Sequence, residues 1–92
     1  MMKYTLVNRR KSVKVKNNIE FITWMRKNDS QLWKCNEDFM EGYCYRKLTF
    51  EKMVIDHQTS DDFVMSLQKN NLLKVAYRNR SFWNFLKKQP YN

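Results

Sequence analysis

The chain has 92 residues, 18 lysine and arginine residues against nine aspartate and glutamate residues, a formal net charge of +9, and only one glycine and one proline. This length predicts a single compact domain over residues 1–92, and the scarcity of glycine and proline excludes a collagenous or loop-rich disulfide scaffold. No apolar run approaches the ~18 residues of a membrane span and the N-terminus lacks a signal-peptide pattern, so we expect a cytoplasmic protein without a membrane partner.

The charges are segregated along the chain. Residues 1–19 carry six basic and no acidic side chains, residues 20–62 carry six basic and nine acidic, and residues 63–92 carry six basic and none acidic. A lysine-rich surface can serve solubility alone, but this clustering favours an anionic partner, either nucleic acid or an acidic protein groove.

Two short alternating segments at the start predict a β-hairpin. Residues 4–7 and 13–15 would be its strands, joined by a five-residue loop over 8–12. Val13 and Val15 would point inward. Five cations would lie on the other side or at the tip, where they could grip phosphate or simply be solvated: Arg9, Arg10, Lys11, Lys14 and Lys16.

Capping patterns predict two helices in the middle of the chain. Asn17, with Glu20 three positions on, forms a capping box for the first helix. Its buried stripe would contain Ile19, Ile22 and Met25, widened by Phe21 and Trp24. Leu32 and Trp33, in the connection that follows, are too apolar to be wholly exposed.

The second helix would begin at Asn36, whose side chain can cap it, with Glu37 and Asp38 in the first turn. Gly42 costs this helix roughly 1 kcal/mol against alanine, which indicates close packing at that position. Residues 48–55 could continue the helix, but their β-branched and aromatic side chains favour a short strand.

A third helix and a strand are predicted over residues 59–77. Thr59 or Ser60 can cap the helix, and Asn70-Asn71 is a plausible left-handed stop. In the strand that follows, Lys74 would lie on the opposite side from its apolar neighbours. A last short helix, capped by Ser81 and ended by Pro90, completes an α+β fold in the order ββααβαβα.

The C-terminal part interleaves rings with cations. Single-stranded nucleic acid is held in this way, because cations follow the phosphates while rings stack on bases. Phe82 and Phe85 share a helical face and would be core, which leaves Trp83 partly exposed. The candidate binding residues in this part are Lys74, Tyr77, Arg78, Arg80, Trp83, Lys87 and Lys88.

Catalysis and cofactor binding have little support in this sequence. His57 is the only histidine, and one imidazole without a positioned second base is not a catalytic constellation. Cys35 and Cys44 match no zinc spacing, and we expect them to stay reduced in a cytosol. There is no glycine-rich phosphate loop. The sequence therefore predicts a protein that is not an enzyme and holds no metal or cofactor.

Residues 63–75, FVMSLQKNNLLKV, resemble the recognition helix and first wing strand of winged-helix regulators. The resemblance covers about a seventh of the chain and implies a DNA-binding transcriptional regulator. The chain departs from that family at Asp61 and Asp62, because carboxylates at the end of the helix that enters the major groove would repel phosphate. The strand predicted before the helix also stands where that fold has another helical turn.

In size, in its asparagine- and lysine-rich composition and in its hairpin-first order, the whole chain resembles short orphan proteins of Bacteroidetes phages and mobile elements. Some of these are anti-CRISPR proteins, including inhibitors of type VI-B RNA-guided RNases. The resemblance carries over no site residue. It implies a stoichiometric inhibitor that docks on a guide-RNA channel or grips the RNA itself. A chain this basic has the wrong sign for a DNA mimic.

The sequence as a whole predicts a small binding protein that recognises RNA or a ribonucleoprotein. One phosphate-contacting edge would come from the N-terminal hairpin and the other from the C-terminal cations, with Tyr77 or Trp83 stacking on bases. This hypothesis requires the two ends of the chain to converge. A regulator of duplex DNA and a protein–protein interaction module are the alternatives.

Overall fold

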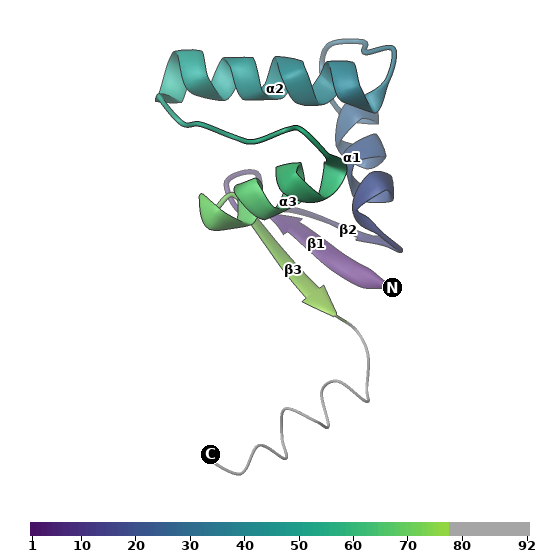
Figure 1. The fold of residues 1–92 in the computed structure, drawn as a ribbon. Helices are drawn as coiled ribbons and strands as arrows, with labels where there is room; N and C mark the ends of the chain where they lie inside the picture. Colours follow the sequence, from purple (N-terminus) through teal and green to yellow (C-terminus); the bar gives the residue numbers. More distant parts are fainter. Residues whose placement is uncertain (78–92) are drawn as a thin grey trace, which may run out of the picture.

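The computed structural model describes residues 1–77, which form a three-stranded sheet and three helices (Figure 1). The elements are β1 (Met2–Leu6), β2 (Lys11–Val15), α1 (Asn18–Lys27), α2 (Asn36–Glu51), α3 (Ser60–Lys69) and β3 (Leu73–Tyr77). This is the predicted α+β class, with the predicted N-terminal hairpin and a later strand. The predicted terminal helix lies outside the described residues.

The sheet is antiparallel with the strand order β2-β1-β3, so the first strand of the chain is the central one. Tyr4 in β1 is paired with Val13 on one side and with Val75 on the other. Because side chains alternate along a strand, these three residues face the same side of the sheet. β3, the last described strand, is thus hydrogen-bonded directly to β1, and β1 is hydrogen-bonded on its other side to β2.

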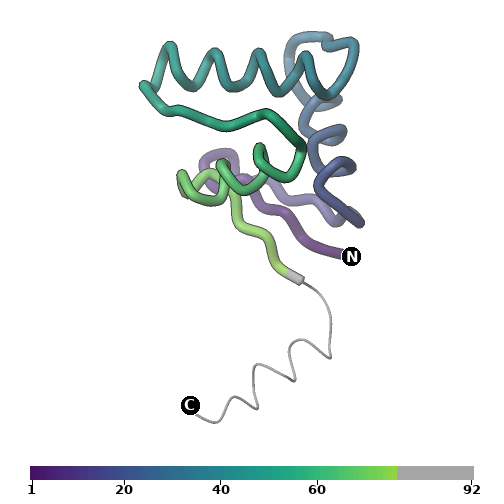
Figure 2. The backbone as a smooth tube through the Cα atoms, viewed as in Figure 1, coloured from purple at the N-terminus to yellow at the C-terminus, as the bar shows by residue number. Residues whose placement is uncertain are grey.

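The helices lie on one side of this sheet, as Figures 1 and 2 show. Tyr4 is fully buried there and stacks on Phe21 of α1, with ring centroids 4.5 Å apart. α2 lies above α3 in this view (Figure 1), and the Tyr43 ring of α2 packs edge to face against Phe63 of α3, with ring centroids 5.5 Å apart. Buried aromatic rings therefore connect the sheet to α1, and α3 to α2, in a small core.

Of the three helix starts predicted within residues 1–77, two are confirmed in detail. Asn17 accepts a hydrogen bond from the Glu20 backbone N–H at 2.9 Å, and the Glu20 carboxylate in turn accepts from the Lys16 N–H at 2.8 Å. Thr59 accepts from the Asp62 N–H at 3.0 Å. The predicted stripe on α1 is wrong at one position, because Ile19 is 59% exposed and Phe21 takes its place in the core.

The prediction that the Asn36 side chain caps α2 is wrong. Cys35 is the N-cap residue and makes no side-chain capping bond. The Asn36 amide instead accepts from Arg26 Nε at 2.8 Å and donates to Thr23 Oγ1 at 2.9 Å. A half-buried amide that links two side chains of α1 contributes more to the contact between α1 and α2 than to the end of its own helix.

The strand predicted over residues 48–55 is absent from the described part of the chain. α2 continues to Glu51, and its last turn contains an ion pair between Lys47 Nζ and Glu51 Oε2 at 2.8 Å. Lys52 then takes a left-handed conformation, φ 56°, and ends the helix. Helical packing of residues 39–47 overrides the β propensity of the segment that follows them. The predicted stop after α3 is confirmed, with Asn71 at φ 60°.

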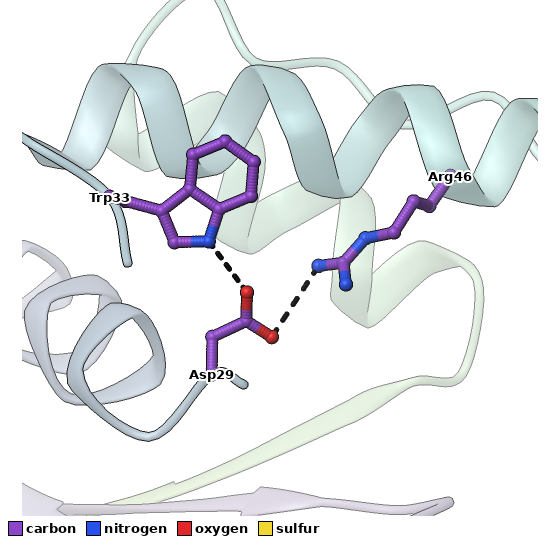
Figure 3. Close-up of polar contacts among 3 residues, drawn as sticks. All are labelled: Asp29, Trp33 and Arg46. Carbon is purple, nitrogen blue, oxygen red and sulfur yellow. Dashed lines mark hydrogen bonds and ion pairs between the residues drawn. The ribbon is translucent and has the colours of Figure 1, made fainter. Parts of the chain in front are cut away.

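Gly42 lies against the indole ring of Trp33, which explains the only glycine of the chain. A Cβ at this position would fall 2.3 Å from Trp33 Cη2. The indole is held there because its Nε1 donates to Asp29 Oδ2 at 2.6 Å, and Asp29 also lies 3.6 Å from Arg46 Nη2 (Figure 3). The neighbouring Leu32 is fully exposed, contrary to prediction, while Trp33 is partly buried as predicted.

Gly42→Ala is therefore expected to destabilise the protein by about 1–3 kcal/mol, although alanine is the better helix former by about 1 kcal/mol. The added methyl group must displace a ring that is held by a hydrogen bond. Urea unfolding followed by circular dichroism measures the change. Thr49→Ala, at an exposed position of the same helix, is the control and should gain a few tenths of a kcal/mol. A stability gain for Gly42→Ala would show that Trp33 is free to move.

Candidate nucleic-acid interface

The face of the sheet that the helices leave uncovered carries three lysines. Alternation places one set of side chains opposite the buried Tyr4 and Leu6. We call this set the lysine face; its members are Lys3, Thr5, Ser12, Lys14, Lys74 and Ala76. All six are exposed or half-buried. The three strands contain no aspartate or glutamate, so the lysine face has no acidic side chain.

The register brings these lysines close to one another. Lys3 in the central strand is paired directly with Lys14 in β2. Lys74 is paired with Thr5, which makes it a diagonal neighbour of Lys3. Directly opposed side chains have Cβ atoms about 4.5–5.5 Å apart and diagonal ones about 7–8 Å. The three ammonium groups can therefore be presented to one ligand.

These positive charges are not neutralised within the described residues. Within residues 1–77, the ion pairs join Arg46 to Asp29 and Lys47 to Glu51, both away from the lysine face. Like charges directly opposite one another in a sheet are destabilising. The polar contact on this face joins the hydroxyls of Thr5 and Ser12 at 2.9 Å. An anion with several charges would relieve the repulsion between the lysines.

Of the predicted binding residues, the structure brings Lys14 and Lys74 onto the same face from opposite ends of the chain. Lys16 is exposed just beyond β2. Tyr77 is the last residue of β3, and its backbone is paired with Met2. The remaining C-terminal candidates lie outside the described residues, namely Arg78, Arg80, Trp83, Lys87 and Lys88.

The cations at the hairpin tip do not join the lysine face. Lys11 is paired with Leu6, so its register places it on the helix side, and Arg10 is exposed in the turn at φ 54°. Arg9 lines a cavity of about 220 Å³ beside α2, together with Tyr43 and Arg46. Burial raises the pKa of Tyr43 to about 12, against the smaller opposing effect of the Arg9 charge. The tip therefore approaches α2 instead of extending the sheet surface.

Lys3 lies on the lysine face but is absent from the set of binding residues predicted from the sequence. The sequence does not reveal that Lys3 lies in the central strand, because it does not show that β1 pairs with both other strands. The available indication is its alternation with Tyr4: if Tyr4 points into the core, Lys3 must point out. Strand order then decides that this outward lysine stands between Lys14 and Lys74.

The described residues offer no arrangement for metal binding, since residues 1–77 contain no group of three or more histidine, cysteine, aspartate or glutamate side chains suited to it. His57 is exposed in the connection before α3. Cys35 and Cys44 are both free thiols. Nine residues along a helix separate them by about 13 Å, which is too far for a disulfide.

The two cysteines should differ strongly in alkylation rate. Burial, assisted by the charge of Asp56, raises the pKa of the Cys44 thiol to about 12, so almost none of it is thiolate at pH 8. Cys35 is half-buried at the start of α2. We expect Cys35 to react with iodoacetamide at least about 100-fold faster, and the Cys44 rate to rise about tenfold per pH unit below pH 11. Peptide mass spectrometry measures both rates; similar rates in the folded protein would contradict the assignment, and 8 M urea should abolish the difference.

None of the helices in the described part of the chain combines the length and apolar character needed to cross a bilayer. No family model matches this chain, and no curated protein or solved structure is significantly similar to it. The candidate site is therefore argued from the geometry of the sheet alone.

Proposed function

We propose that the protein binds single-stranded RNA without catalysing a reaction, and that the lysine face provides the phosphate contacts. The observation that supports this most is the register that sets Lys3 beside Lys14 and diagonal to Lys74, on a face without carboxylates. Lysine ammonium groups are point charges that bind phosphate oxygens without demanding one geometry. A flexible polyanion strand can adapt its backbone to such a row.

The shape of the lysine face favours a single strand over a duplex. A sheet face is open to solvent, whereas sequence-specific duplex binding usually inserts a helix or a β-ribbon into the major groove. The described helix that a winged-helix regulator would use is α3, and its first turn holds Asp61 and Asp62. The Asp61 carboxylate lies at that end of the helix, where it accepts a hydrogen bond from Asn18 Nδ2 at 2.8 Å. This charge would repel a DNA backbone.

Binding through the lysine face would depend little on base sequence. Its six residues include no aromatic side chain, so they offer charges and hydroxyls but no ring on which a base could stack. Phosphate contacts position a nucleic acid and carry no sequence information directly. Such a surface suits a protein that covers exposed RNA, including the inhibitor of an RNA-guided nuclease that the resemblance to phage orphan proteins implies.

Fluorescence anisotropy with labelled nucleic acids tests this function. The probes are a single-stranded RNA of about 20 nucleotides, a DNA duplex of the same length and heparin, each titrated at several salt concentrations. We expect the RNA strand to bind more tightly than the duplex, with affinity that falls as salt rises. Tighter binding of the duplex would favour the DNA-regulator alternative. Absence of binding to all three probes would contradict the proposal.

A further inference from the structure

α2 carries apolar side chains on two opposite faces. Its inner face buries Phe39, Met40 and Tyr43 in the core. On its outer face Tyr45 is 67% exposed and Leu48 is 51% exposed. A helix that is apolar on both sides is normally covered on both sides. Within the described residues the outer face of α2 has no such cover.

The outer face of α2 borders a groove, and the Trp33 indole ring forms part of its wall. The groove encloses about 630 Å³ and is lined by Leu32, Trp33, Lys34, Asp38, Glu41, Gly42 and Tyr45. Trp33 rests on Gly42 and is held by its bond to Asp29, so one side of the groove is formed before any partner arrives. Leu32 stands at the edge of the groove with its side chain fully exposed.

The charge of this groove is opposite to that of the rest of the protein. Asp38 and Glu41 are exposed at its rim, and neither is ion-paired with a lysine or arginine of residues 1–77. Glu37 adds a third carboxylate in the same turn of α2. Lys34 is the cation among the lining residues. An acidic rim around apolar side chains, in a chain of net charge +9, fits a partner that is both cationic and apolar.

We propose that this groove binds a cationic amphipathic helix of a partner protein. Leu32 and Tyr45 would receive the apolar stripe of that helix, while Asp38 and Glu41 would pair with its lysines or arginines. The proposal does not depend on RNA binding, since the groove shares no residue with the lysine face. α3 lies between α2 and the sheet, so both surfaces could be occupied at once (Figure 1).

Calorimetry with a model peptide tests the groove. The probe is a leucine–lysine peptide of about 14 residues with its leucines on one helical face, and the control is a scrambled peptide of the same composition. Overall charge repels both peptides, so binding must come from a local acidic and apolar surface. We expect micromolar affinity for the ordered peptide, with at least tenfold weaker binding of the scrambled one.

Variants assign the binding to the groove. Leu32→Ala combined with Tyr45→Ala should weaken peptide binding by at least about tenfold, and Asp38→Asn with Glu41→Gln should reduce its salt dependence. Ile19→Ala with Met65→Ala removes two other exposed apolar side chains and should change affinity less than about twofold. Lys3→Gln, Lys14→Gln and Lys74→Gln together should leave peptide binding intact, whatever they do to RNA binding.

Three results would overturn the proposal: equal binding of the scrambled peptide, unchanged binding by the Leu32→Ala and Tyr45→Ala variant, or a groove already filled by a second copy. Sedimentation velocity without peptide detects the last case. A dimer in the unaltered protein that dissociates in the double variant would assign the groove to self-association.

Discussion

Replacing Lys3, Lys14 and Lys74 together with glutamine is expected to weaken binding of single-stranded RNA by about 100-fold at 0.1 M salt. Each phosphate contact to a single strand contributes about −0.7 to the slope of log K against log salt, so the loss of three contacts lowers affinity by about two decades. The slope itself should become less steep by about 2. Anisotropy titrations between 50 and 300 mM salt measure both quantities.

The same variant should be more stable than the unaltered protein. Lys3 and Lys14 are directly paired across the strands, and removing both charges relieves a repulsion of about 0.2–1 kcal/mol. A variant that binds RNA less well while unfolding at higher urea concentration cannot have lost binding through misfolding. The two measurements together therefore separate a functional effect from a structural one.

A charge-matched control is available on the helix side of the molecule. Lys27, Lys34 and Lys52 are exposed in α1, in the connection after it and at the end of α2. Changing these three residues to glutamine lowers the net charge by the same amount, yet should reduce RNA affinity by less than about threefold. Equal losses in the two triple variants would show that net charge alone drives binding and would remove the lysine face as a site.

Arg78 and Arg80 lie outside the described residues, and their contribution stays a prediction. Because the sequence predicts that both are surface residues, reversing them to glutamate should abolish RNA binding while changing the free energy of unfolding by no more than about 0.5 kcal/mol. Unchanged RNA affinity in this double variant would limit the interface to the sheet. The comparison with the lysine-face variant measures how far the interface extends beyond β3.

Local sequence patterns predicted the elements of this fold better than their partners. Asn17 and Thr59 start helices because their capping bonds need only residues within one turn. Asn36 has the same side chain as Asn17, but its amide is hydrogen-bonded to Thr23 and Arg26 of α1 and does not cap α2. No local sequence pattern reveals these long-range partners. The segment after Lys47 is a second case in which tertiary contacts decide: it has β propensity, but packing of α2 extends the helix to Glu51. Local sequence patterns therefore predicted helix starts and ends correctly where tertiary contacts did not oppose them.

The candidate site shows the same division. Outward positions of Lys14 and Lys74 follow from alternation within each strand, which the sequence contains. Their common face follows from the order β2-β1-β3, which depends on long-range pairing. For that reason the sequence shows neither that Lys3 stands between Lys14 and Lys74 nor that Arg9 lies beside α2 instead of on the sheet face. Gly42 lies between these cases: its cost to the helix indicated a close neighbour, and the structure identifies that neighbour as Trp33.

Asp29→Ala should be among the most destabilising single substitutions, at about 2–4 kcal/mol. The Asp29 side chain is only 5% exposed, and it accepts from Trp33 Nε1 while lying 3.6 Å from Arg46 Nη2 (Figure 3). Its removal leaves a partly buried indole N–H and a guanidinium group without their partner. Glu41→Ala, which removes an exposed carboxylate of α2, is the control and should change the unfolding free energy by less than about 0.5 kcal/mol.

The contribution of Asp29 should also depend on pH in a defined direction. Burial alone would raise the pKa of this carboxyl, but the hydrogen bond from Trp33, the charge of Arg46 and backbone hydrogen bonds from Ser30 and Gln31 together outweigh burial and lower the pKa below 3.8. A carboxyl whose pKa is lower in the folded state stabilises the protein fully above the unfolded-state value of about 3.9 and loses that effect as pH falls through the folded-state value. The difference in unfolding free energy between the unaltered protein and Asp29→Ala should therefore be constant from pH 5 to 7 and shrink below about pH 4. Urea titrations across this range measure it, and a difference that grew on acidification would mean that Asp29 is protonated in the folded protein.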